Sequence, residues 1–148
     1  MCLDFHPERP ALLAVGLYDG TVMVFDVRNK SNKPIYQSTV RTAKHTDPVW
    51  QVYWQPDEPN KSLSFYSISS DGRVTNWQLM KNKLEAEEVI KLKLVLDQDK
   101  ELVENKKESF LYGLAGGMCF DFNKFEDHLF LVGTEEGKIH LCSKSYSG

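Results

Sequence analysis

Residues 64–78 read SFYSISSDGRVTNWQ and are the most informative stretch of the chain. Apolar and polar residues alternate on both sides of an Asp-Gly pair, and such alternation indicates half-buried strands. Asp-Gly between two alternating runs predicts a tight hairpin, because glycine adopts a positive φ without steric cost. This stretch therefore predicts two antiparallel strands that are joined at Asp71 and Gly72.

The hairpin is part of a unit that occurs three times. Each copy has a first strand that ends in an aromatic residue, a second apolar run, an acidic-Gly turn and a third strand. The copies are residues 2–26, 51–78 and 119–143, and their turns are Asp19-Gly20, Asp71-Gly72 and Glu136-Gly137. A fourth alternating run follows the first two copies, at residues 35–39 and 90–96. The sequence therefore predicts an all-β chain of about three four-stranded antiparallel units.

These units recur at longer intervals than the roughly 40–45 residues of a propeller blade, so insertions are expected between them. We place the units at about residues 1–40, 45–96 and 117–148, with a charged insertion at about 97–112. The insertion has few apolar residues, which favours a solvated loop or a short polar helix. A contact arm that orders only against a neighbouring subunit is the alternative.

The second unit resembles the WD-repeat β-propellers. In that family a His, a Ser or Thr, an Asp and a Trp form a hydrogen-bonded chain. The resemblance assigns this structural role to His45, Ser67, Asp71 and Trp77. Buried polar groups need partners, and a closed network fixes strand register.

The other two units depart from this pattern. Val15 and Val132 stand where the second unit has Ser, and Phe25 and Cys142 stand where it has Trp. We therefore expect packing alone to hold these units, with less rigid turns.

A closer resemblance covers nearly the whole chain. The phrases AVGLYDGTVMVFDVR, KHTDPVWQVYWQ, SSDGRVTNWQL and LVGTEEGKIHLCSKSYSG resemble dynein intermediate chains, and the axonemal outer-arm type fits best. The resemblance implies a non-catalytic assembly subunit whose propeller seats on the dynein heavy-chain tail. It also implies further intermediate and light chains as partners, and a location in cytoplasm, cytoskeleton and the axoneme of a cilium or flagellum.

Propellers of this family have about seven blades, so three blades form an incomplete ring. Such a piece leaves strand edges unpaired and apolar flanks facing water. We therefore expect the chain to aggregate or remain partly unfolded when it is expressed alone.

Composition argues against several other functions. The formal net charge is −3, whereas nucleic-acid-binding surfaces carry a basic excess. The chain has no run of 18 apolar residues that would span a membrane. Its three cysteines include no C-x-x-C pair, and His140 with Cys142 supplies only two metal ligands. No nucleophile or phosphate-loop motif is present, so we expect no catalytic residue, cofactor, metal or small-molecule substrate.

Loops on a rigid scaffold often carry binding residues. The candidates for partner contact at the turns and blade junction are Tyr18, Asp47, Trp50 and Glu135. Trp50 either packs in the core or anchors a partner, because aromatic side chains are enriched at interface hot spots. The alternative function is a general peptide- or modification-reading propeller, which would need Arg or aromatic clusters at its channel.

Overall fold

The computed structural model describes residues 1–92 and 115–144, and the described part is all-β apart from one turn of 3₁₀ helix, η1 (Val40–Thr42). Its strands form three antiparallel sheets. The first sheet contains β1 (Cys2–Phe5), β2 (Leu12–Gly16), β3 (Val22–Asp26) and β4 (Tyr36–Gln37). The second contains β5 (Val49–Trp54), β6 (Ser64–Ser69), β7 (Arg73–Leu79) and β8 (Leu84–Lys91). The third contains β9 (Gly117–Phe122), β10 (Leu129–Thr134) and β11 (Ile139–Ser143).

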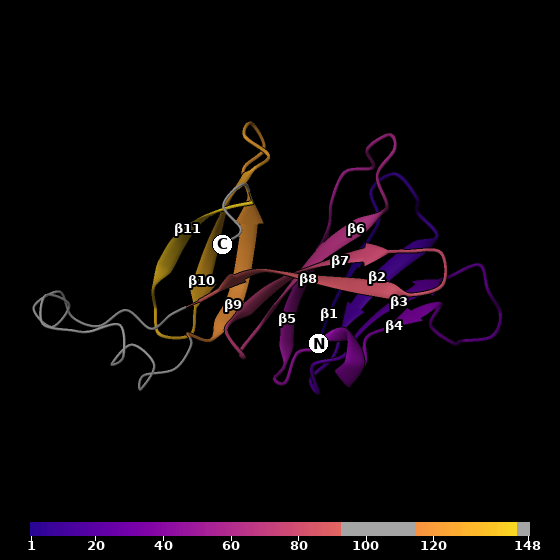
Figure 1. The fold of residues 1–148 in the computed structure, drawn as a ribbon, viewed down its shortest axis with the longest axis horizontal. Helices are drawn as coiled ribbons and strands as arrows, with labels where there is room; N and C mark the ends of the chain where they lie inside the picture. Colours follow the sequence, from indigo (N-terminus) through magenta and orange to yellow (C-terminus); the bar gives the residue numbers. More distant parts are fainter. Residues whose placement is uncertain (93–114, 145–148) are drawn as a thin grey trace, which may run out of the picture.

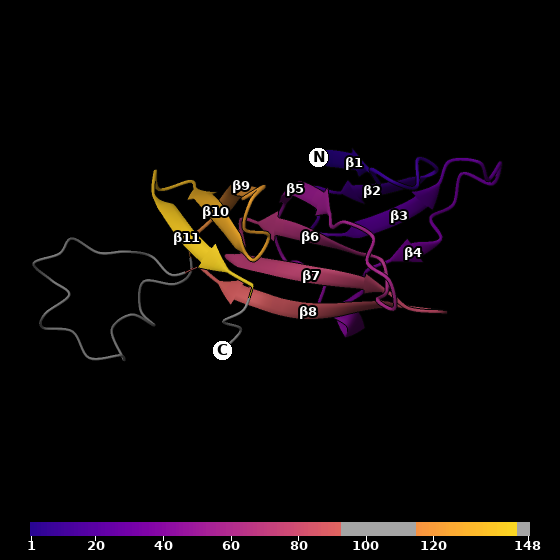
Figure 2. The same cartoon turned by 90° about the horizontal axis from the view of Figure 1, so that it is seen from above.

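The sheets lie side by side as successive blades (Figure 1). Within each sheet, the strands follow one another in chain order, as a meander. The first strands β1, β5 and β9 lie toward one edge of the array (Figure 2), and β5 contacts both β1 and β9. This arrangement is consistent with part of a propeller, in which first strands line the axis, and it confirms the predicted fold class.

A glycine with a left-handed backbone stands in each of the three predicted turns. The φ angles are +92° at Gly20, +84° at Gly72 and +83° at Gly137. These turns join β2 to β3, β6 to β7 and β10 to β11, and the paired strands keep an antiparallel register. Alternating side chains are therefore placed on opposite faces of each hairpin.

Two apolar cores lie between neighbouring sheets. The core between the first and second sheets is built around Val22, Val24, Trp54, Phe65 and Trp77. The core between the second and third sheets is built around Tyr66, Ile68, Phe120, Phe130 and Val132. The second sheet contributes one face to each core, so its strands are the most completely buried.

The outer faces of the first and third sheets expose apolar side chains. In the first sheet Leu3 and Phe5 are exposed, and they pair across the strands with Val15 and Leu13. In the third sheet the exposed side chains are Leu131, Ile139 and Leu141. Both faces resemble the inner faces of the cores, as expected at the two ends of an incomplete row of blades.

The structure corrects the predicted start of one strand. We predicted the fourth strand of the second unit at residues 90–96, but β8 begins at Leu84 and pairs with the whole of β7. Leu84 and Ala86 face the core from a charged run, and this short apolar alternation is easily missed. Residues 93–96 and the predicted insertion at 97–112 lie outside the described residues. In the first unit β4 covers only two of the predicted residues 35–39.

The chain segment between the first two sheets was also not predicted in detail. It contains η1, which ends at Ala43 in a left-handed conformation with φ of +58°. Within residues 1–92 and 115–144, no helix has the length and apolar character needed to cross a membrane.

Candidate functional site

Four polar side chains meet in the second sheet and its entry loop. His45 Nδ1 lies 2.9 Å from Asp71 Oδ2, and His45 Nε2 lies 2.6 Å from Ser67 Oγ. Trp77 Nε1 donates to the same Ser67 oxygen at 2.7 Å. His45, Ser67 and Trp77 are completely buried, and the Asp71 side chain is 4% exposed. The structure thus brings together all four residues of the predicted network.

One arrangement of protons satisfies every member of this network. Trp77 can only donate, so Ser67 Oγ accepts its hydrogen and can pass its own hydrogen to His45 Nε2. Neutral His45 then carries its proton on Nδ1 and donates to the Asp71 carboxylate. This series of hydrogen bonds connects the loop before β5 with β6, the β6–β7 turn and β7.

Asp71 is the centre of the network. Its carboxylate also accepts hydrogen bonds from the backbone N–H groups of Thr46 and Arg73 and from the Arg73 guanidinium. Arg73 Nη2 continues to the Lys44 carbonyl, which ties the turn to the entry loop again. Burial alone would raise the Asp71 pKa, but hydrogen bonds from His45 and Arg73 to the carboxylate hold it well below its usual range.

A His, a Ser and an Asp in contact invite comparison with a nucleophilic site, but the geometry argues against one. The Ser67 hydroxyl is completely buried and already accepts from Trp77, so no substrate carbonyl can approach it. The arrangement can hold strands in register, and it offers no route for acyl transfer.

The corresponding positions of the other sheets contain no such network. Val15 and Val132 have no polar atom on their side chains, and Phe25 and Cys142 replace the indole donor. Turn residue Asp19 accepts from the Thr21 backbone N–H at 2.9 Å and lies 3.8 Å from the Lys44 ammonium.

Glu136 has fewer partners than Asp71. It is exposed, and Glu136 Oε1 accepts from the Gly116 backbone N–H at 3.2 Å. The third-sheet turn is therefore tied to the chain entering β9 by this side-chain hydrogen bond and by the backbone hydrogen bond from Glu135 to the Gly116 carbonyl.

The residues suggested for partner contact do not form one cluster. Tyr18 is 70% exposed and its ring meets Trp50 edge-on at 6.5 Å. Trp50 is half-buried and donates to Ser70 Oγ. Asp47 is exposed and its backbone carbonyl accepts from Ser69 Oγ. Glu135 is exposed in the third sheet, where its backbone N–H donates to the Gly116 carbonyl.

Polar contacts between the first two sheets were missed by the sequence analysis. The Asp4 carboxylate accepts from the Trp54 backbone N–H, and the Asp4 carbonyl accepts from Trp54 Nε1. Arg9 pairs with Asp57 at 3.0 Å. No local motif marks these pairs, because their members are about fifty positions apart.

His6 is another buried residue that the motifs did not single out. Its Nδ1 accepts from the backbone N–H groups of Glu8 and Arg9, and its ring lies 4.9 Å from that of Trp54. Burial lowers the His6 pKa. The only local signal is the position of His6 directly before Pro7, at the end of a predicted strand.

The cysteines lie apart from one another and are all free. Burial raises the pKa of Cys142 to about 11 and also raises that of Cys2, so both favour the unreactive thiol. Among residues 1–92 and 115–144, no group of three or more His, Cys, Asp or Glu side chains could hold a metal ion.

Comparison with known proteins gives strong similarity to one group. The chain is 54% identical to the 78 kDa intermediate chain of Chlamydomonas reinhardtii flagellar outer-arm dynein, over 99% of this chain and 21% of that relative. It is 48% identical to rat dynein axonemal intermediate chain 1, over 99% of this chain and 20% of the relative. It is 37% identical to human dynein axonemal intermediate chain 4, over 98% and 18%.

No protein-family model matches the chain. The chain spans about one fifth of the length of these curated relatives. The resemblance found in the sequence is confirmed, because its phrases lie within an alignment that covers almost every residue of the chain. By sequence, then, the chain is homologous over nearly its whole length to a segment of the axonemal dynein intermediate chains.

Proposed function

We propose that the chain is part of a non-catalytic assembly subunit of an axonemal dynein. The observation that carries this proposal is the 54% identity to an outer-arm intermediate chain over 99% of this chain. In this proposal the propeller seats on the heavy-chain tail, together with other intermediate and light chains. The subunit supports motility in the axoneme of a cilium or flagellum.

The geometry of the described residues supports a scaffold role. The one constellation that resembles catalytic chemistry, around Ser67, is buried and fully hydrogen-bonded. We propose that His45, Ser67, Asp71 and Trp77 act as a structural lock of the second blade, and that the subunit is not an enzyme.

We also propose the division into blade-like units at about 1–40, 45–96 and 117–148. The exposed apolar faces at Leu3 and Phe5 and at Leu131 and Leu141 support further blades on both sides. Burial of such a face is favourable by about 25 cal/mol per Å². The rim residues Tyr18, Asp47, Trp50 and Glu135 are proposed as partner contacts, with Tyr18 and Trp50 as an aromatic pair.

The proposal is tested by purification from cilia. The protein that contains this chain, carrying an epitope tag, is expressed in a ciliated cell, and dynein is extracted from isolated axonemes and sedimented. We expect the tagged protein to co-sediment with a dynein heavy chain and to be recovered from the axoneme. Recovery without any dynein subunit would contradict the proposal.

A further inference from the structure

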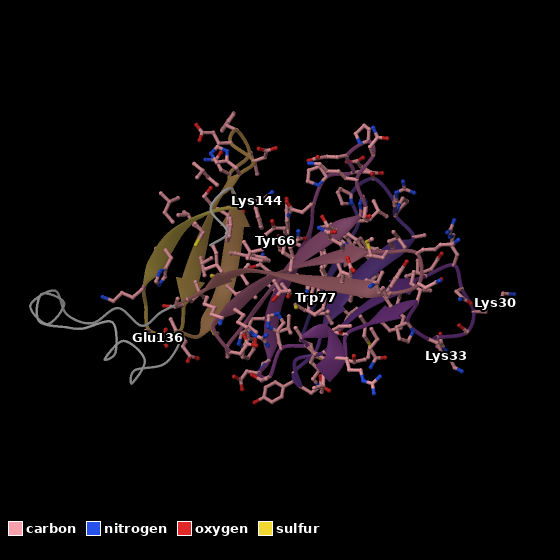
Figure 3. The ribbon with its side chains drawn as sticks, viewed as in Figure 1. Lys30, Lys33, Tyr66, Trp77, Glu136 and Lys144 are labelled. Atoms are coloured by element: carbon pink, nitrogen blue, oxygen red, sulfur yellow. The ribbon has the colours of Figure 1, made fainter. Side chains whose placement is uncertain are left out.

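A polar cavity of about 430 Å³ opens between the second and third sheets. Its lining includes Gln55, Ser64, Tyr66, Asn76, Gln78 and Lys144. Ser64 and Tyr66 of β6 face Gln78 and Asn76 of β7, so these four side chains share one face of the second sheet. Lys144 directly follows β11, and Figure 3 shows it beside Tyr66 in the gap between the two sheets. The cavity lies at the opposite end of the sheets from the Asp-Gly turns.

An aromatic cluster adjoins this cavity at Tyr66 and Lys144. Phe122 stacks on Phe130 at 4.9 Å between ring centroids, and Tyr66 meets Phe122 edge-on at 5.1 Å. The Lys144 ammonium lies 5.0 Å from the Phe122 ring centroid and 5.5 Å from that of Tyr66. The apolar core between the sheets thus changes to a polar surface at the position of Lys144.

Two buried polar atoms of the lining have no partner within the described residues. Lys144 Nζ donates to Gln55 Oε1, and because an ammonium can only donate, this contact fixes the orientation of the Gln55 amide. The unpaired atom of the Gln55 amide is therefore its nitrogen, Nε2, which is a donor. Gln55 is 9% exposed, and Nε2 has no acceptor within the described residues. Asn76 Oδ1 is likewise buried without a donor. Leaving such groups unsatisfied is unfavourable, because each gives up its hydrogen bonds to water and gains none in return.

Lys144 adds an uncompensated positive charge. No carboxylate in the described part of the chain forms an ion pair with it, since Glu58 of the same lining pairs with Lys61. Burial lowers the Lys144 pKa, and Asp127 and Glu58 oppose this effect only from a distance. A carboxylate in contact with the ammonium would stabilise its charged form.

The unsatisfied atoms define the chemistry of a ligand. Lys144 and Gln55 offer two neighbouring donors, which match the two oxygens of a carboxylate. Asn76 Oδ1 requires an N–H donor, and a peptide backbone supplies one. An extended acidic peptide satisfies all three atoms, whereas a small free carboxylate leaves Asn76 unpaired.

We propose that this cavity binds an exposed acidic segment of a partner protein. The carboxylate of an Asp or Glu side chain lies between Lys144 Nζ and Gln55 Nε2, and a backbone N–H of the segment donates to Asn76 Oδ1. The proposal deepens the assembly role and rests on it, because the partner is a neighbouring subunit of the complex.

A zero-length carbodiimide crosslinker tests the proposal in the native complex. It joins a carboxylate to a lysine amine only when the two are in contact, and mass spectrometry identifies the joined residues. We expect Lys144 to be linked to an Asp or Glu of another subunit. Lys61 is the internal comparison, because its contact with Glu58 predicts a link within the chain. Links from Lys144 only to carboxylates of this chain, or no link at all, would overturn the proposal.

Variants then measure the contribution of each donor. The probe is a fluorescently labelled synthetic peptide that contains the linked acidic residue. We expect Lys144→Met and Gln55→Glu each to weaken its binding about tenfold, because one removes the ammonium and the other places a competing carboxylate beside it. Lys30→Met, at an exposed position between β3 and β4 and outside the cavity lining, is the matched control and should change binding less than twofold. Equal effects of all three variants would overturn the proposal, and circular dichroism verifies that each variant is folded.

The outcome is separable from that of the assembly role. A protein that co-sediments with a dynein heavy chain, but whose Lys144 forms no link to another subunit, refutes only the cavity proposal. A protein that is recovered without any dynein subunit refutes the assembly role itself.

Discussion

The β6–β7 hairpin and the β10–β11 hairpin have the same backbone plan and are stabilised differently. Both have a positive-φ glycine after an acidic residue. In the first, Asp71 accepts hydrogen bonds from His45, Thr46 and Arg73 and is nearly inaccessible to solvent. In the second, Glu136 is exposed and accepts one hydrogen bond from the Gly116 backbone.

The difference shows that the turn and the network have separate tasks. The Asp-Gly or Glu-Gly turn is sufficient to reverse the chain, since both hairpins keep an antiparallel register. The turn end of the hairpin already contacts the loop that precedes β5, through Ser69 Oγ to the Asp47 carbonyl and the Ser70 N–H to the Pro48 carbonyl. The network adds further bonds to that loop through His45 and through Arg73. We therefore expect the middle blade to resist local opening more strongly than the third blade.

The largest expected effect comes from Trp77→Ala. This substitution leaves a large cavity in the core between the first two sheets and removes the donor to Ser67, so we expect a loss of about 4 kcal/mol. Cys142→Ala at the equivalent position of β11 removes one sulfur and should cost about 1 kcal/mol. Hydrogen exchange of peptides from β6–β7 and β10–β11, measured in the assembled protein, gives both values. Equal losses of stability in the two hairpins would show that the network adds nothing to the contribution of Trp77.

Local patterns in the sequence were sufficient to predict the turns, because an acidic-Gly pair such as Asp71-Gly72 is visible within a few residues. The network was predicted from the resemblance to WD-repeat propellers, because His45 and Ser67 are 22 positions apart and no local pattern joins them. The start of β8 was missed because Leu84 stands in a charged run, where burial depends on the partner strand β7.

The polar cavity could not be predicted in this way. Gln55 and Lys144 are 89 positions apart, and only the packing of the second sheet against the third brings them together. Asp4 and Trp54 meet for the same reason, through the packing of the first sheet against the second.

An intermediate effect is expected for Asp71→Asn. The carboxamide keeps the size of the side chain but loses the charge that faces Arg73 and replaces one of the two oxygen acceptors by an NH₂ donor, so we expect a loss of about 3 kcal/mol. Glu136→Gln, at an exposed position, should change stability by less than about 0.5 kcal/mol. Hydrogen exchange of the two hairpins separates these values, and a similar response of both would contradict the assigned role of Asp71.

The same residue predicts the direction of an acid effect. The pKa of Asp71 is lower in the folded protein than the ordinary carboxyl value of 3.8. The unfolded chain therefore binds the proton more readily, and the stabilisation by Asp71 is complete above that value and decreases as the pH falls below it. We expect the β6–β7 hairpin to lose protection below about pH 4. This loss should be smaller in Asp71→Asn, and an unchanged acid response in that variant would argue against the carboxylate as its source.

The smallest effects on stability are expected for substitutions of the turn glycines. Gly20 of the first sheet and Gly137 of the third sheet are compared. A methyl group on Gly20 would lie 2.0 Å from the His45 carbonyl oxygen, whereas one on Gly137 would meet nothing within 4 Å. Both residues have positive φ, so Gly→Ala costs about 1 kcal/mol at each from backbone strain alone. Gly20→Ala must also displace the loop that carries His45, so we expect about 2 kcal/mol in total and reduced protection of the β6–β7 hairpin. If Gly20→Ala reduced protection of the β2–β3 turn alone, this would contradict a role of that turn in supporting the loop that carries His45. The position of His45 would then depend on the hydrogen-bond network and not on its contact with the β2–β3 turn.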